Sequence, residues 1–107
     1  MNRAEFLQQL EAEYKKCVEI SRAKNSDYAQ DGDPFANFRS TEAIGVPATK
    51  GILVRQMDKL CRVANLLKRE AQVKDESIED TLRDMANYSI ILLLLVRAER
   101  NGGYVER

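Results

Sequence analysis

One helical pattern restricts the fold of this chain more than any other feature, and it covers residues 75–100. Its first half places Glu76, Asp80 and Asp84 four residues apart, which lines their carboxylates along one face of a helix. Its second half is apolar at every position from 90 to 96. A helix that is apolar on all sides is normally buried on all sides. In so short a chain, partner subunits must cover part of it, so we expect a homo-oligomer, at least a dimer.

The rest of the chain also follows helical patterns. Apolar residues recur at spacings of three and four over 2–22 and over 49–71, which predicts two more long helices. A short helix is expected over 34–41, because Asp33 followed by proline is a strong start signal. No alternation typical of strands is present. We therefore predict an all-α fold, a small bundle of three long helices and one short helix, in a single domain over 1–107.

The composition excludes several classes of function. The chain has 17 basic residues, 17 acidic residues and no histidine. Without histidine, serine–histidine and cysteine–histidine mechanisms are impossible, and the commonest transition-metal ligand is absent. A net charge of zero provides no overall field to attract nucleic acid or an anionic membrane, so we expect neither as a partner.

The hydropathy pattern and the cysteines indicate the compartment. The apolar run 90–96 is far shorter than the ~20 residues that a membrane span needs. The first residues are amphipathic and charged, unlike a secretory signal. Cys17 and Cys61 lie within helical patterns and show no metal-site spacing, which favours reduced thiols. We therefore expect a cytoplasmic protein.

The irregular segment 24–48 is a candidate binding region, because long connections in small domains often carry function. It holds both prolines and two of the five glycines. A capping loop without any ligand would explain it equally well. If it does bind a ligand, its polar and aromatic side chains are the candidates, namely Lys24, Asp27, Tyr28, Phe35, Asn37 and Phe38.

The acidic face described above could hold a metal ion. Carboxylates one helical turn apart can bind a hard cation such as Mg²⁺. The predicted metal ligands are Asp58, Glu76, Asp80 and Asp84. Nearby basic side chains could hold phosphate oxygens, and they are Lys24, Arg55, Lys59 and Arg62. A cation, carboxylates and basic residues together would suit phosphoanhydride chemistry without histidine.

Ion pairing between two helices is the alternative explanation of the same residues. The segment 50–69 has a net charge of +5 and the segment 75–88 has a net charge of −4, so the two helices should pack antiparallel. Asp80 and Asp84 are expected to be half-buried, because they lie beside core positions of their helix. Half-buried carboxylates lower stability unless they are paired, so their clustering favours a site.

Three motifs of the chain resemble a known family. They are KNSDYAQDGDPFANF at 24–38, Arg55-x-x-Asp58-Lys59-x-x-Arg62, and ESIEDTLRDMANYSII at 76–91. Together they resemble the phage and prophage family called nucleotide modification associated domain one. The resemblance implies a small α-helical phage protein that acts on nucleotides or binds them.

A weaker similarity is to the all-α nucleoside triphosphate pyrophosphatases, the MazG-like and dimeric dUTPase group. Those proteins hold Mg²⁺ with a Glu-Glu-x-x-Glu helix and a Glu-x-x-Asp helix. This chain has Ser77 three residues before Asp80, and its preceding helix offers Asp58 where that group has several glutamates. The departure places hydrolysis in question.

Three functions are therefore considered. The first is a phage-encoded nucleotide-binding protein, with Mg²⁺-dependent pyrophosphohydrolase activity left open and Glu79 as the residue that would activate water. In it Tyr28, Phe35 or Phe38 stacks the base and Asn37 reads its edge. The second is a non-catalytic oligomer that sequesters a nucleotide signal of host defence. The third is a protein-interaction module that inhibits a host enzyme. A phage protein would act in the host cytoplasm.

Overall fold

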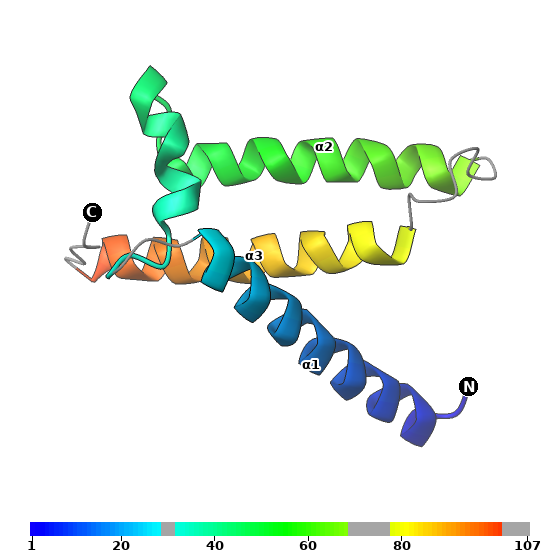
Figure 1. Ribbon diagram of the computed structural model, residues 1–107. Coiled ribbons are helices and arrows are strands. Elements are labelled where there is room, and N and C mark those ends of the chain that lie inside the picture. The colour runs from blue at the N-terminus through cyan, green and yellow to red at the C-terminus, as the bar shows by residue number, and fades with distance from the viewer. Residues whose placement is uncertain (29–31, 69–77, 102–107) are drawn as a thin grey trace.

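The computed structural model describes residues 1–28, 32–68 and 78–101. These ranges contain three α-helices and one 3₁₀ helix and form no strand (Figure 1). In chain order the elements are α1 (Arg3–Tyr28), η1 (Ala36–Ile44), α2 (Ala48–Lys68) and α3 (Ile78–Arg100). The prediction of an all-α fold with three long helices and one short helix is confirmed.

The helices α2 and α3 form the centre of the molecule. They lie side by side and antiparallel, as the opposite charges of the two segments predicted (Figure 1). An ion pair joins them where Lys59 Nζ lies 3.1 Å from Asp84 Oδ2. Gln56 also donates hydrogen bonds across the seam, to Ser89 Oγ at 2.8 Å and to the Met85 carbonyl at 3.0 Å. Polar contacts therefore fix the register of the two helices.

The buried core lies at one end of this helix pair, where α2 begins and α3 ends. Ile52 and Leu95 are fully buried there, beside Ala48. Phe35 and Phe38, which precede and enter η1, pack against this core. Residues three apart lie on the same side of a 3₁₀ helix. The two rings therefore attach this segment to the bundle.

The short helix differs from its prediction in type and position. It was expected as a helix over 34–41 and is a 3₁₀ helix that begins two residues later and ends three residues later. The carboxylate of Asp33 explains the difference, because it accepts a hydrogen bond from the Phe35 backbone N–H at 3.0 Å and pairs with Arg39 Nε at 2.8 Å. Asp33 thus holds the turn before the helix. Gly45 ends η1 with a φ of 80°, a conformation that glycine adopts readily.

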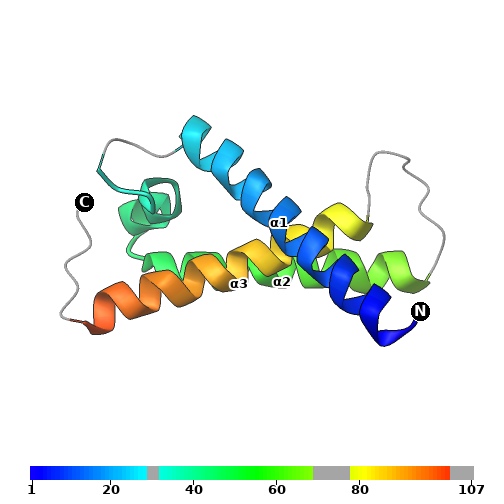
Figure 2. The same cartoon turned by 90° about the horizontal axis from the view of Figure 1, so that it is seen from below.

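The first helix is longer than predicted. Asn2 caps it, since its Oδ1 accepts a hydrogen bond from the Glu5 N–H at 2.9 Å. It was expected to end near Arg22 but continues to Tyr28, because no glycine or proline interrupts the chain before Gly32. It packs on α3 and crosses it at an angle (Figure 2). Lys24 therefore lies on a helix and not in a loop.

The remaining predictions on the fold concern helix ends, thiols and membranes. The expected end of the helix over 49–71 and the expected start of the helix over 75–100 fall outside the described residues. Cys17 and Cys61 are both free. In the ranges that the structure describes, no helix is long and apolar enough to cross a membrane.

Candidate functional site

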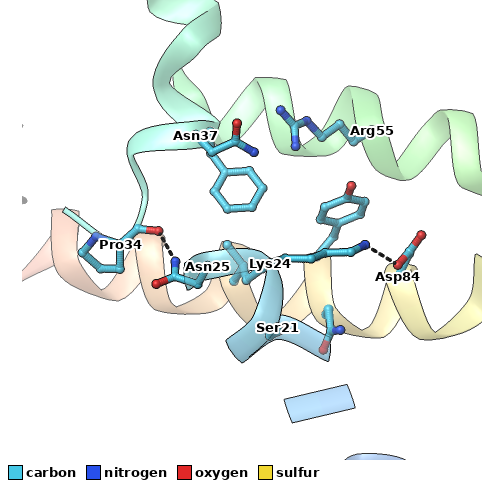
Figure 3. A pocket seen from close by; sticks show the side chains of 11 residues that line it. Ser21, Lys24, Asn25, Pro34, Asn37, Arg55 and Asp84 are labelled. Atoms are coloured by element: carbon cyan, nitrogen blue, oxygen red, sulfur yellow. Dashed lines mark hydrogen bonds and ion pairs between the residues drawn. The ribbon is translucent and has the colours of Figure 1, made fainter. Parts of the chain in front are cut away.

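A pocket of about 260 Å³ lies where the last turns of α1 meet η1, α2 and α3 (Figure 3). We call it the junction pocket. It is lined by Ser21, Lys24, Asn25, Pro34, Asn37, Phe38, Arg55, Asp84, Asn87, Tyr88 and Ile91. Two aromatic rings, three asparagine amides and charges of both signs therefore converge from four elements of the chain.

Arg55 of α2 is the central cation of the junction pocket. Its guanidinium carbon lies 5.0 Å from the centre of the Phe38 ring and 6.0 Å from that of Tyr88. The two rings meet edge to face, with centroids 6.2 Å apart and planes at 89°. Contacts of a cation with aromatic faces hold the guanidinium in place without neutralising it. Among the described residues, no carboxylate pairs with Arg55.

A second group of charges lies on the opposite wall. Lys24 Nζ from α1 lies 3.1 Å from Asp84 Oδ1 (Figure 3), and Lys59 Nζ from α2 lies 3.1 Å from Asp84 Oδ2. Partial burial acts to raise the pKa of Asp84, but hydrogen bonds from Lys59 and Lys24 outweigh it, so this pKa lies below its ordinary value. Two lysines share one carboxylate, and Arg55 adds a further positive charge. Of the charged side chains that line the junction pocket, Lys24 and Arg55 exceed Asp84 by one positive charge, and Lys59, which pairs with Asp84 from outside the lining, adds a second.

The wall formed by η1 is held by polar contacts of its own. Arg39 and Asp33 form an ion pair in which both side chains are less than a tenth exposed. Asn25 Nδ2 on α1 donates a hydrogen bond to the Pro34 carbonyl at 3.0 Å. These contacts join the end of α1 to the start of η1 and place the Asn37 amide at the edge of the pocket (Figure 3).

The junction pocket brings together several residues predicted from the sequence. Lys24, Asn37, Phe38, Arg55 and Asp84 line it. Asp84 occurs there as the partner of two lysines, one of them the predicted Lys59.

Other predicted residues lie elsewhere or cannot be placed. Phe35 packs against the core and does not line the pocket. Arg62 is exposed further along α2. The side chains of Asp27 and Tyr28 lie outside the described part of the structure.

The structure describes three of the four predicted metal ligands, Asp58, Asp80 and Asp84, and these three do not form a metal-binding group. The side chain of Asp80 is 70% exposed, so the expectation that it is half-buried is wrong. Asp58 is also exposed. Within the residues that the structure describes, no group of three or more acidic, cysteine or histidine side chains could hold a metal ion. Glu76 falls outside these residues, so the complete ligand set stays a prediction.

Glu79 belongs to another cluster on α3, centred on Arg83. The Arg83 guanidinium contacts Glu13 at 2.8 Å, Asp80 at 3.0 Å and Glu79 at 3.5 Å. The hydrogen bond with Glu13 raises the pKa of Arg83, and the bond with Arg83 lowers that of Glu13. The cluster borders a mainly apolar groove of about 400 Å³ between α1 and α3, lined also by Leu10, Tyr14, Cys17, Leu82 and Ala86. Glu79 does not line the junction pocket.

Tyr88 is the main pocket residue that the sequence analysis did not assign to a site. It lies one helical turn after Asp84, so i,i+4 spacing already placed the two side chains on one face. Ser21 and Asn25 were missed for a different reason. The first helix was expected to end near Arg22, so the face that joins these residues to Lys24 was not considered.

The comparisons with known proteins agree with the motifs. No curated protein and no solved structure matches the chain. The family model that does match covers somewhat less than half of the chain, including α2 up to its end and most of α3. It thus contains Arg55, Asp84 and Tyr88 of the junction pocket. Residues 50–96 match the family described as nucleotide modification associated domain 1, which confirms the resemblance found in the sequence.

Proposed function

We propose that the junction pocket binds a nucleotide or a nucleotide-like small molecule. The observation that carries this proposal is the environment of Arg55. Its guanidinium lies against Phe38 and Tyr88 and has no carboxylate partner among the described residues. Arginine binds phosphate oxygens through two parallel hydrogen bonds, and aromatic faces accept bases. The family match at 50–96 supports the same class of ligand.

The lining residues suggest which part of the ligand each of them would contact. Arg55 and Lys24 lie on facing walls and would hold the phosphates (Figure 3). Phe38 and Tyr88 offer aromatic surface to the base. Asn37 supplies a donor and an acceptor for the base edge or the sugar. The volume of about 260 Å³ lies just below the ~300–1,000 Å³ usual for ligand pockets, which favours a mononucleotide over a longer ligand.

The arrangement supports binding more directly than hydrolysis. Asp84 is the carboxylate of the described pocket lining, and two lysines already share it. The Mg²⁺-dependent pyrophosphohydrolase remains the alternative, and its metal site would need Glu76 together with Asp58, Asp80 and Asp84. The family resemblance adds a phage origin to the proposal. Binding without turnover would then suit a protein that sequesters a nucleotide signal of host defence.

Calorimetry tests the proposal directly. The purified chain is titrated with a panel of mono-, di- and triphosphate nucleotides, with and without Mg²⁺, and each mixture is then assayed for products. Arg55→Met should weaken binding about 10- to 100-fold, since hydrogen bonds to charged groups contribute ~1.5–3 kcal/mol. Arg97→Met is the matched control, because Arg97 is exposed near the end of α3 and does not line the pocket.

The outcomes separate the candidate functions. Binding without Mg²⁺, with the nucleotide recovered intact, identifies a sequestering protein. Mg²⁺-dependent release of pyrophosphate would instead establish the hydrolase. Absence of heat with every nucleotide would overturn the proposal and leave the protein-interaction module.

A further inference from the structure

One face of the α2–α3 pair is apolar and uncovered. On α2 its large side chains are Leu53, Met57, Leu60 and Leu67, which recur at spacings of four, three and seven. Such residues form one stripe on a helix. They are between 49% and 74% exposed, although apolar side chains at helical spacing usually face a core.

Two polar contacts show on which side of the helix pair this stripe lies. The ion pair of Lys59 with Asp84 borders the junction pocket. Gln56 precedes Lys59 by three residues and bonds Ser89 at the other edge of the seam. Leu53 and Leu60 lie one turn before and one turn after Gln56, so they share its side. The uncovered stripe is therefore on the face of α2–α3 that points away from the pocket.

The second helix continues this surface. Met85 and Leu93 lie one turn before and one turn after Ser89, on the same side. Leu93 is 41% exposed. The stripes of α2 and α3 thus form one surface, which we call the reverse face. Its residues are Leu53, Met57, Leu60, Leu67, Met85 and Leu93.

The chain exposes more surface than a compact monomer of its size. Its accessible surface is 8226 Å², whereas a compact monomer of 12.2 kDa exposes roughly 6,100 Å². Its radius of gyration is 16.0 Å, against roughly 13 Å for a compact domain of this length. The excess of about 2,000 Å² per chain, or about 4,000 Å² for two copies, falls within the ~2,000–5,000 Å² in total that obligate homodimers bury. The reverse face supplies apolar surface for such an interface.

We propose that the reverse face binds a second copy of this chain and that the two α2–α3 pairs form a four-helix bundle. A permanently uncovered apolar face requires a partner that is always present in equal amount, and another copy meets that condition. A twofold axis brings the same patch of each copy together, and an antiparallel helix pair with apolar stripes on both members suits that symmetry. Leucine and methionine are typical of permanent interfaces.

This assembly has a consequence for the pocket. The junction pocket is on the opposite side of α2–α3, so the second copy leaves it open. Each chain keeps its own pocket, and the dimer offers two sites on its outer sides. The inference does not depend on the proposed function, since the partner is recognised by apolar surface alone.

Analytical ultracentrifugation is the first test. The chain should sediment at twice its 12.2 kDa at micromolar concentration. Leu60→Glu places a charge in the middle of the reverse face and should raise the dissociation constant at least 100-fold. Ile44→Glu is the control, because Ile44 is 80% exposed on η1 and lies outside the reverse face, so its dimer should persist. A monomeric wild-type chain, or a Leu60→Glu variant that remains fully dimeric, would overturn the proposal.

Cross-linking decides the question if Leu60→Glu fails to fold. Met57→Cys and Ile44→Cys are each made in a Cys61→Ser background and treated with a short bismaleimide. The proposed interface predicts covalent dimers of the Met57→Cys variant and few of the Ile44→Cys variant. The reverse pattern would show that the chains meet through another surface.

Discussion

Two neighbouring residues of α3 organise opposite kinds of charge cluster. Arg83 contacts three carboxylates, from Glu13, Glu79 and Asp80, so its cluster has an excess of negative charge. Asp84 contacts two lysines, and Arg55 lies in the same pocket, so its cluster has an excess of positive charge. Both residues also attach α1 to α3, through Glu13 and Lys24.

The difference indicates what each cluster can do. The Nε and both terminal nitrogens of Arg83 meet carboxylates and use four of its five N–H donors, so this cation has little bonding capacity left for a ligand. The positive cluster keeps cations whose hydrogen bonds are only partly used, in a half-buried position where their field is weakly screened. We therefore assign attachment of α1 to the Arg83 cluster and anion binding to the Asp84 cluster.

Of the substitutions at the centres of the two clusters, Asp84→Asn should change binding most. Removing the one negative charge of the described lining should tighten binding of a nucleoside monophosphate about 3- to 10-fold at low ionic strength, and the gain should shrink as salt is added. Calorimetry at several salt concentrations measures it. Asp80→Asn in the other cluster should leave the affinity unchanged. A tenfold loss of affinity in Asp84→Asn would show instead that this carboxylate contacts the ligand or a metal ion, as the sequence-based metal site supposed.

Gly51→Ala tests the wall of the positive cluster. A Cβ at Gly51 would lie 2.9 Å from Thr41 Oγ1 and 3.0 Å from its Cγ2, so η1 must shift away from α2. The strain should exceed the gain in helix propensity, and we expect a net loss of about 1 kcal/mol in unfolding free energy. Urea denaturation measures this loss. Thr41→Ala in the same chain should recover part of it, whereas additive effects of the two substitutions would contradict the proposed contact.

The pH dependence of stability follows from the lowered pKa of Asp84. Its folded pKa is below its ordinary value of 3.8, so its ion pairs stabilise the fold fully above that value. The stabilisation is lost as the pH falls through the folded pKa. The stability difference between wild type and Asp84→Asn should thus be constant between about pH 5 and 7 and shrink below about pH 4. Unfolding curves across this range measure it, and a constant difference down to pH 3 would contradict the ion pairs.

The smallest effect on binding is expected for Arg83→Met. The substitution should leave nucleotide affinity unchanged within about twofold, because Arg83 does not line the junction pocket. It should speed amide hydrogen exchange in the first half of α1, since the contact with Glu13 is lost. A large drop in affinity would show that the two clusters act as one.

The sequence predicted the helices well and the pocket in part. Helical periodicity found α1, α2 and α3, because each is long and strongly patterned. Lys24, Phe38 and Arg55 were recognised by residue type, and the pocket unites them. The extension of α1 to Tyr28 was missed because the last residues of this helix are weak helix formers. Tertiary contacts such as that of Lys24 hold them in the helix, and no local sequence pattern reveals such contacts.

The acidic face was the harder inference. Spacing placed Asp80 and Asp84 on the same side of a helix, but it did not give the crossing angle of α1. That angle places Lys24 on Asp84 and Glu13 on Arg83, and it leaves Asp80 largely in solvent. Periodicity describes one helix at a time, whereas a site depends on where the next helix crosses it. The homo-oligomer expected from the apolar run stays a prediction.

The position of the junction pocket between α1 and the rest of the chain has a thermodynamic consequence. In the described residues α1 packs mainly on α3, while η1 belongs to the unit formed with α2. A ligand that contacts Lys24 and Asn37 together would tie the outer helix to that unit. By thermodynamic reciprocity, the free energy by which the ligand strengthens the packing of α1 on the rest of the chain also strengthens the binding of the ligand. Ligand binding in the pocket and ordering of α1 would then be thermodynamically coupled, so that each favours the other.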